Sequence, residues 1–456
     1  MELRLFIISS SKYIFLLFLL ILFLNTTSVF AEENSSDVTV SSEEVISEFP
    51  LGIRFKAVFH SEEKLSDVRV FFKSISSSAS QYAYMELFSS GYSYTGDLFY
   101  RTDTGNRYIP PGTILNYWFV ITTESGEEIK TKPKSFTYED SRYTWDKITK
   151  GPITVMFHGP MKSRAERLAD AAIESLEFMA PVIGVETKTP IVVTLYNNNS
   201  EMIGAIRSKS MTTSRELITE GQAFHSQGVV LVLAGRRDIG TVTHEITHIL
   251  VGRATGSVQV PLWLNEGLAE YGNMDKSISY IRFLEWAMDT NRLLPFSHLK
   301  NFPGDPNLIL VAYGQSRSMV KFLLDNYGEN KMVDLLSELK SGSIIEKSVK
   351  DIYGKDLIDI ESDWRESIGA PPYIPPDIND KEIEKPENKQ EFKILTLSSD
   401  DDGIDISNVP SSKESDENDK SISTNSCYSA GKSDLSFIGI FSLIICLSYL
   451  SRNKIR

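Results

Sequence analysis

The sequence predicts a multidomain protein in which an all-β sandwich precedes an α+β domain with a helical C-terminal half. Short apolar segments of alternating pattern fill the N-terminal part of the chain, which is typical of an antiparallel sandwich. The next part of the chain contains both strand-like segments and segments with helical periodicity. The part after that shows helical periodicity only. The 456 residues have room for two or three domains, and the 41% apolar share is sufficient for a sizeable core.

Composition excludes several classes of function. A net charge of −14 argues against nucleic acid as a partner and against electrostatic attraction to an anionic membrane. The two cysteines, Cys427 and Cys446, both lie near the C-terminus. Disulfides therefore do not stabilise the predicted domains, and we expect neither a thiolate zinc site nor a cysteine nucleophile.

The first 31 residues are expected to be a signal peptide. Arg4 and Lys12 precede an apolar run at 13–24, and residues 29–31 offer small side chains for cleavage. An uncleaved N-terminal membrane helix is the alternative. Under either interpretation the rest of the chain is exported, so we expect the protein at the cell surface.

Residues 32–146 are predicted to form the sandwich, of the immunoglobulin or fibronectin type III kind. Apolar and polar residues alternate between 53 and 59, and the segments 113–123 and 128–136 predict a hairpin. The aromatic side chains of this region either belong to the core and to cross-strand pairs, or bind a polysaccharide or a protein partner. These side chains are Tyr92, Tyr94, Phe99, Tyr100, Tyr117 and Trp118.

Residues 147–370 are predicted to form the α+β domain. Strands are expected at 153–157, 190–196 and 228–233, and an amphipathic helix is expected at 162–179. Later helices are expected at 278–289, 308–326, 331–340 and 360–368.

A helix that starts near Asp238 carries the residues best suited to chemistry. His244 and His248 are four positions apart, so their imidazoles lie one turn apart on the same face. That spacing lets both reach one zinc ion at about 2.0–2.1 Å. Glu245 lies beside the first imidazole, where it can take a proton from a metal-activated water. The pattern favours a zinc site over two buried histidines, each of which would need its own hydrogen-bond partner.

A catalytic zinc site needs a third protein ligand and an open fourth position. The segment 263–271 contains Glu266, 18 residues after His248. Pro261 precedes this segment, so we expect Glu266 near the start of a second helix that packs against the first.

These residues resemble those of the gluzincin zinc metallopeptidases. The run His244-Glu245-x-x-His248, followed by Trp-Leu-Asn-Glu-Gly-Leu-Ala-Glu-Tyr at 263–271, is most similar to the peptidase-MA-like domain family. The aminopeptidase N family is a more distant relative. The resemblance implies a zincin-type metallopeptidase fold for the second domain and one zinc ion with His244, His248 and Glu266 as ligands. It also implies Glu245 as the general base.

The resemblance implies two supporting residues as well. In the wider clan, a carboxylate one turn beyond the Glu ligand hydrogen-bonds the first His, and Glu270 holds the corresponding position. An ordinary surface acid is the alternative. Relatives in the aminopeptidase N family place a Tyr on a later helix, where its hydroxyl stabilises the oxyanion of the tetrahedral intermediate. Tyr313 is the positional counterpart, and plain packing is its alternative role.

One element of the aminopeptidase N family is absent from this sequence. The Gly-x-Met-Glu-Asn strand, which holds the free amine of the substrate, has no counterpart before His244. The corresponding region reads Gly221-Gln222-Ala223-Phe224-His225. An edge strand there would still bind an extended peptide through backbone hydrogen bonds, which favours an endopeptidase.

The C-terminal part is predicted to attach the enzyme to a membrane. Residues 371–432 are acidic and rich in Pro and Ser, so we expect a disordered linker. Residues 433–451 are predicted to be a transmembrane helix, followed by a basic cytoplasmic tail at 452–456. The alternative is a C-terminal sorting tag that is removed when the protein is attached near Cys427.

As a whole, the sequence predicts an exported, membrane-anchored zinc metallopeptidase that hydrolyses bonds in a peptide or protein substrate. One alternative is a surface binding or adhesion protein that retains the zincin fold without catalysis. Another is a zinc amidase that acts on cell-wall material.

Overall fold

The computed structural model describes residues 38–374, with gaps at 105–106, 207–219, 257, 276–279 and 304. The predicted signal peptide, nearly all of the linker, the segment at 433–451 and the basic tail lie outside the described residues. Within the part of the chain that is described, no helix is both long enough and apolar enough to cross a bilayer.

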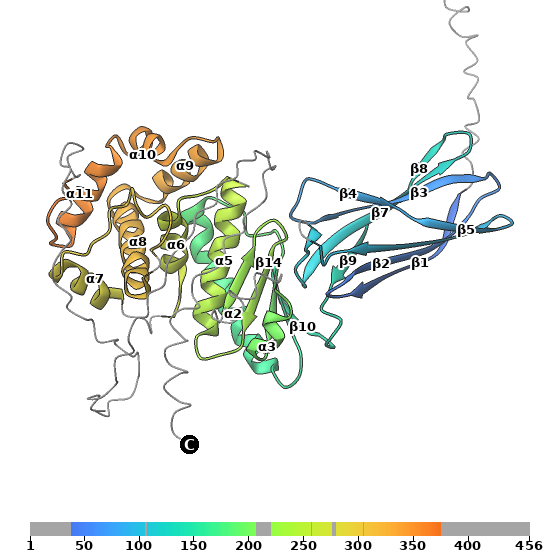
Figure 1. The fold of residues 1–456 in the computed structure, drawn as a ribbon, viewed down its shortest axis with the longest axis horizontal. Coiled ribbons are helices and arrows are strands. Elements are labelled where there is room, and N and C mark those ends of the chain that lie inside the picture. The colour runs from blue at the N-terminus through green and yellow to red at the C-terminus, as the bar shows by residue number, and fades with distance from the viewer. Residues whose placement is uncertain are drawn as a thin grey trace, which may run out of the picture.

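The N-terminal part, here called the β region (residues 38–138), consists of two antiparallel sheets, drawn in blue and cyan in Figure 1. One sheet has the strand order β1-β2-β6-β5, and the other has the order β4-β3-β7-β8, with β9 also paired to β7. The strands are β1 (Thr39–Glu48), β2 (Gly52–His60), β3 (Leu65–Ser74), β4 (Gln81–Tyr84), β5 (Glu86–Ser90), β6 (Ser93–Arg101), β7 (Thr113–Thr123), β8 (Glu128–Lys130) and β9 (Lys134–Tyr138).

Alternation along the strands places one face of each sheet in a shared core. In β3, Val68, Val70 and Phe72 are buried, whereas the residues between them are partly exposed. Phe72 stacks on Phe55 of β2 with ring centroids 5.8 Å apart, so the two sheets are joined by aromatic contacts. The β-rich N-terminal region is therefore confirmed. Its assignment to the immunoglobulin or fibronectin type III class stays a prediction.

The aromatic residues of the β region divide between its core and its surface. Tyr94, Tyr100 and Tyr117 are buried in the core. On the outer face, Phe71 stacks on Trp118 and on Tyr82, with ring centroids 5.6 and 5.1 Å apart. Rings that stack across strands cover one another's faces, so this row fits cross-strand stabilisation better than a flat platform for a sugar.

The second part of the chain is built around a five-stranded mixed sheet of order β10-β11-β12-β14-β13. Its strands are β10 (Asp146–Lys150), β11 (Ile153–Phe157), β12 (Ile191–Tyr196), β13 (Gly221–Phe224) and β14 (Val229–Leu233). The three central strands are parallel, and the two outer strands are antiparallel to their neighbours. Both faces of the central strands are buried, which explains why these strands read as continuous apolar runs.

Helices cover one face of this sheet. Helix α2 (Lys162–Ile183) and helix α5 (Asp238–Thr255) pack together, and their apolar sides form a core with Val155, Val193 and Val230. Figure 1 shows α2 and α5 lying between the sheet and the later helices. This position makes α5 the central element of the second part.

The β region covers the other face of the same sheet. Val192 and Leu231 point into the core of the β region and are fully or almost fully buried. Gly112, with a φ of +104°, turns the chain against this face, where an added Cβ would lie 2.6 Å from the Oγ1 of Thr194. The Thr194 hydroxyl donates to the carbonyl oxygen of Pro111 at 3.0 Å. The two parts of the chain therefore share one continuous core.

The remaining chain is helical, as expected from the sequence. It contains α6 (Leu262–Gly272), α7 (Tyr280–Asp289), α8 (Pro306–Tyr327), α9 (Glu329–Lys340), α10 (Ile345–Tyr353) and α11 (Leu357–Ser367). A short helix, α3 (Asn199–Ile203), follows β12. Helix α10 was not predicted, although Ile345 and Val349 have helical spacing and are buried.

Candidate metal centre

Helix α5 carries both histidines and is anchored by its apolar side. Ile246, Ile249 and Leu250 are fully buried in the core formed with α2 and the sheet. This anchoring leaves the imidazoles of His244 and His248, one turn apart, facing α6. The spacing of four residues seen in the sequence therefore places both imidazoles on the same face of the helix.

Helix α6 brings the third side chain. The Oε2 of Glu266 lies 3.3 Å from the Nε2 of His244 and 3.6 Å from the Nε2 of His248. The two Nε2 atoms are 3.0 Å apart. The three side chains predicted as ligands therefore converge, and His248 is the most exposed of them, with 15% of its side chain accessible.

The convergence fits a tetrahedral zinc ion. Ligand atoms that lie about 2.0–2.1 Å from such an ion are about 3.3–3.4 Å from one another. The three distances between ligand atoms, 3.0, 3.3 and 3.6 Å, bracket that value. The donor set of two imidazoles and one carboxylate is also one that zinc prefers at catalytic sites. His244, His248 and Glu266 can therefore hold a single ion.

Each imidazole is oriented by a partner on its other nitrogen. The Nδ1 of His244 lies 3.1 Å from the Oε1 of Glu270, and the Nδ1 of His248 lies 3.1 Å from the Oδ1 of Asn265. An oxygen at Nδ1 favours the tautomer that carries its proton there and leaves the Nε2 lone pair for a metal. Asn265 was missed by sequence reasoning, although its position directly before Glu266 was a usable signal.

The charges of the site are strongly coupled. Burial opposes ionisation of Glu266, but His248 and His244 outweigh it and hold the pKa of this carboxyl at about 2. Burial also opposes protonation of His244, yet Glu266 and Glu270 raise its pKa well above the usual value. The pKa of His248 is raised in the same way, chiefly by Glu266. Such a site attracts a cation to the position between the three ligands.

Glu245 lies beside the ligands and against the edge strand β13. It is 5% exposed, and burial raises the pKa of its carboxyl, an effect that His248 and His244 partly oppose. The backbone N–H of Ala223 on β13 also acts on this carboxylate and stabilises its charged form. A carboxylate with a raised pKa that is held close to a metal site is suited to accept and return a proton.

Gly221 allows this close approach, and replacing it should displace Glu245. An added Cβ would lie 2.5 Å from the Cγ2 of Thr241, 2.8 Å from the Cγ of Glu245 and 2.9 Å from its Oε1. Because a misplacement of about 1 Å can cost roughly 100-fold in rate, we expect Gly221→Ala to lower kcat/KM to that extent while zinc still binds. Steady-state kinetics and metal analysis check this. Gly235→Ala is the matched control, because the nearest atom to its added Cβ is 3.9 Å away. Unchanged kinetics in Gly221→Ala would contradict the role given to this contact.

A known protein family matches the part of the chain that contains these residues. Residues 171–370, which include α5 and α6, match the model of the Peptidase MA superfamily. This part of the chain belongs to that superfamily. Residues 171–370 are called the peptidase-MA-like domain below. Their membership in this superfamily supports a zinc-peptidase type of function.

Solved structures with some likeness to this chain include an M1 zinc metallopeptidase from Deinococcus radiodurans. That match has 12% sequence identity, covers 71% of this chain and 90% of the other, and has a TM-score of 0.31. A mutant of the M1 zinc metallopeptidase from the same organism matches with 12% identity, coverage of 71% and 91%, and a TM-score of 0.27. Likeness at this level has no bearing on activity. No curated protein matches the chain.

Tyr313 is the tyrosine of the peptidase-MA-like domain that the sequence predicted to act at the site. Tyr313 lies on α8, is 2% exposed, and packs edge-on against Phe302 with ring centroids 4.9 Å apart. Burial raises the pKa of its hydroxyl well above the usual value, and Glu266 is the charge that raises it most. Its predicted role as an oxyanion donor stays a prediction.

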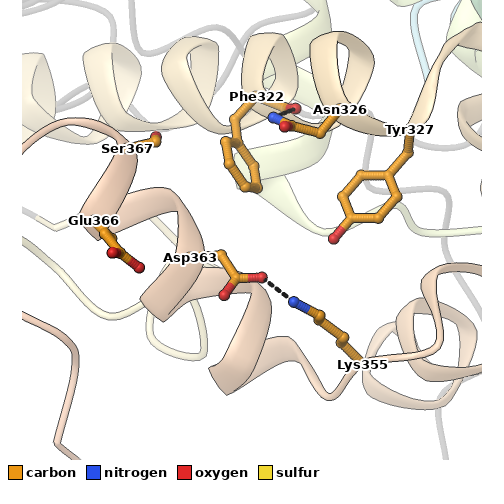
Figure 2. Close-up of a pocket in the computed structure, with 7 residues that line it drawn as sticks. All are labelled: Phe322, Asn326, Tyr327, Lys355, Asp363, Glu366 and Ser367. Carbon is orange, nitrogen blue, oxygen red and sulfur yellow. Dashed lines mark hydrogen bonds and ion pairs between the residues drawn. The ribbon is translucent and has the colours of Figure 1, made fainter.

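A hollow of about 450 Å³ lies elsewhere on the peptidase-MA-like domain. Figure 2 shows that it is lined by side chains from the end of α8 and from α11. Lys355, which lies between α10 and α11, also lines the hollow and pairs with Asp363 at 2.6 Å. None of the predicted site residues lines this hollow, so it is separate from the candidate metal centre.

Proposed function

We propose that the protein is a zinc-dependent peptidase in which Glu245 acts as the general base. The convergence of His244, His248 and Glu266, whose ligand atoms all lie within 4.8 Å of one another, carries this proposal. The buried carboxylate of Glu245 next to them supplies the group that a hydrolase needs and a purely structural metal site does not.

The roles of the side chains follow from their positions. When bound, a zinc ion supplies a Lewis acid that polarises the scissile carbonyl and lowers the pKa of the attacking water. Glu245 accepts a proton from that water and returns it to the leaving amine. Tyr313, which stays neutral at pH 7, donates its hydroxyl hydrogen to the oxygen that becomes negatively charged.

The sheet edge beside Glu245 supports an endopeptidase. Among the described residues, β13 pairs only with β14, so it is an edge strand of the sheet. An extended peptide can add to such an edge through main-chain hydrogen bonds, without any requirement for a free amine. The contact between Ala223 and Glu245 would bring the bound peptide close to the base.

We further propose that the enzyme acts outside the cytoplasm, tethered to a membrane. The targeting pattern at 1–31 and the apolar segment with a basic end at 433–456 support this location. A tethered, exported peptidase would meet polypeptides at the cell surface.

Incubation with denatured casein tests the proposed activity. We expect cleavage at internal bonds, loss of cleavage with a zinc chelator, and recovery when zinc is restored. Mass spectrometry of the fragments distinguishes internal cleavage from stepwise removal of terminal residues. Muropeptides are tested in parallel. Cleavage of muropeptides alone would favour a cell-wall amidase, and a lack of chelator-sensitive cleavage of either substrate would favour a binding protein.

A further inference from the structure

The carboxylate of Glu270 contacts a second side chain besides the imidazole of His244. Only 2% of Glu270 is exposed, and its Oε1 lies 3.1 Å from the Nδ1 of His244. The other oxygen, Oε2, accepts a hydrogen bond from the side-chain amide of Asn273 at 3.3 Å. Asn273 follows directly after α6 and is 7% exposed. One buried carboxylate therefore connects a predicted metal ligand with the end of α6.

The amide of Asn273 is oriented by the main chain that follows it. Its Oδ1 accepts a hydrogen bond from the backbone N–H of Asp275 at 2.9 Å, which closes a turn at residues 273–275, here called the α6 turn. Because the oxygen is engaged there, the Nδ2 of the amide faces Glu270. An ionised carboxylate only accepts hydrogen bonds, so the nitrogen is the atom that suits this contact.

The α6 turn is itself held against helix α5. The backbone N–H of Met274 donates to the Oγ1 of Thr243, the residue before the first predicted ligand, at 3.1 Å. Gly240 lies three residues earlier on α5, where an added Cβ would lie 2.5 Å from the Cβ of Asp275 and 2.9 Å from the Oδ1 of Asn273. The turn therefore contacts the stretch of α5 that leads into the metal ligands.

We propose that Asn273 is a positioning residue that donates a hydrogen bond to Glu270 and thereby holds His244 in the orientation needed to bind the metal. A carboxylate with a partner on one oxygen can still rotate. A second donor, mounted on a turn that is fixed to the same helix as His244, removes that freedom. This proposal rests on the proposed metal site, but it does not depend on which bond the enzyme cleaves.

A purely local role for Asn273 would be to close the α6 turn. In that role only its Oδ1 matters, and an aspartate would serve as well because it keeps that oxygen. In the proposed role the Nδ2 matters. An aspartate would replace this nitrogen, 3.3 Å from the Oε2 of Glu270, with a second carboxylate oxygen. Two carboxylates at that distance in the protein interior repel each other, so the two roles predict opposite results for one substitution.

The test compares Asn273→Asp and Asn273→Ala with Asn198→Asp in the full protein. Asn198, the N-cap of α3, is the matched control because its amide makes the same two kinds of contact. Its Nδ2 donates to the Oε1 of Glu201 at 2.7 Å, and its Oδ1 accepts from the backbone N–H of Glu201 at 3.1 Å. None of the predicted site residues lies on α3.

Zinc affinity is measured by competition with a chromophoric chelator. Loss of an outer partner typically costs a metal site roughly 10–100-fold in affinity. We expect Asn273→Asp to weaken zinc binding to this extent and to alter the visible spectrum of the cobalt(II)-substituted protein. Asn273→Ala should show a smaller loss, because it removes the donor without adding a charge. Asn198→Asp should leave both the affinity and the spectrum unchanged.

A double substitution shows whether Asn273 acts through Glu270. When Glu270→Gln is combined with Asn273→Asp, the amide and the carboxylate exchange places, so a hydrogen bond between the two side chains is restored. The glutamine also keeps an oxygen for the Nδ1 of His244. We therefore expect the double variant to bind zinc more tightly than Asn273→Asp alone. If Asn273→Asp fails to fold, the double variant is expected to recover the folded state, and a lack of recovery would contradict the proposal.

Unchanged zinc affinity in Asn273→Asp would overturn the proposal. So would a larger loss in Asn273→Ala than in Asn273→Asp, an equal loss in Asn198→Asp, or a double variant that binds zinc no better than Asn273→Asp. Because affinity is measured without substrate, a wild-type protein that binds zinc but is inactive would refute the peptidase proposal and leave this comparison intact.

Discussion

Replacing Glu245 with Gln is expected to lower kcat by roughly 10²–10⁴-fold, the usual contribution of a general base. Gln has nearly the same size and fits the same buried position, but its amide cannot accept the proton of the attacking water. The three predicted ligands are untouched, so zinc content should remain close to that of the wild type. Fluorogenic peptide kinetics and native mass spectrometry measure the two quantities on one sample.

Glu177→Gln is the matched control for this substitution. Glu177 lies on the exposed side of α2, and the same change of side chain there should leave kcat and zinc content unaltered. If Glu245→Gln hydrolysed peptides as fast as Glu177→Gln, the proposed mechanism would be wrong. If it lost zinc as well, Glu245 would have to be assigned a role in metal binding.

Removing the β region is expected to unfold the rest of the protein. A fragment that begins at residue 146 would expose Met156, Val192, Val229 and Leu231, which are at most 3% accessible in the whole chain. Burial of one large apolar side chain contributes roughly 1.5–3 kcal/mol. Exposing four of them removes an amount comparable with the roughly 5–15 kcal/mol that stabilises a domain.

Thermal unfolding and hydrogen exchange compare this fragment with a control that comprises residues 38–374. We expect the control to unfold cooperatively, and the shorter fragment to be aggregated or to lack protected amides in the mixed sheet. A shorter fragment that unfolds in one cooperative transition and binds zinc as tightly as the control would contradict the shared core. The β region would then be a separable module.

Local pattern was sufficient to predict the elements that position the site. The helix expected from about Asp238 begins at that residue, and the expected strands at 153–157, 190–196 and 228–233 correspond to β11, β12 and β14. His244 and His248 share a face because helical geometry requires it. The position of Glu266 on the next helix also followed from nearby residues.

Features that depend on packing between distant segments could not be predicted in this way. The contact of Asn265 with His248 depends on how α5 and α6 are arranged in space. The covering of the mixed sheet by the β region joins Pro111 to Thr194 across a long stretch of sequence. Neither periodicity nor composition carries information about such pairs.

The raised pKa values of the two site histidines have a consequence for folding. The folded chain without an ion holds a proton at this pair more tightly than the unfolded chain does. Protons therefore stabilise the fold in acid, and that stabilisation disappears as the pH rises through the folded-state pKa values. A divalent cation bound to the deprotonated nitrogens would supply stabilisation in that higher pH range instead. One positive charge can thus replace another at this site, and the chain can be compact before a metal binds.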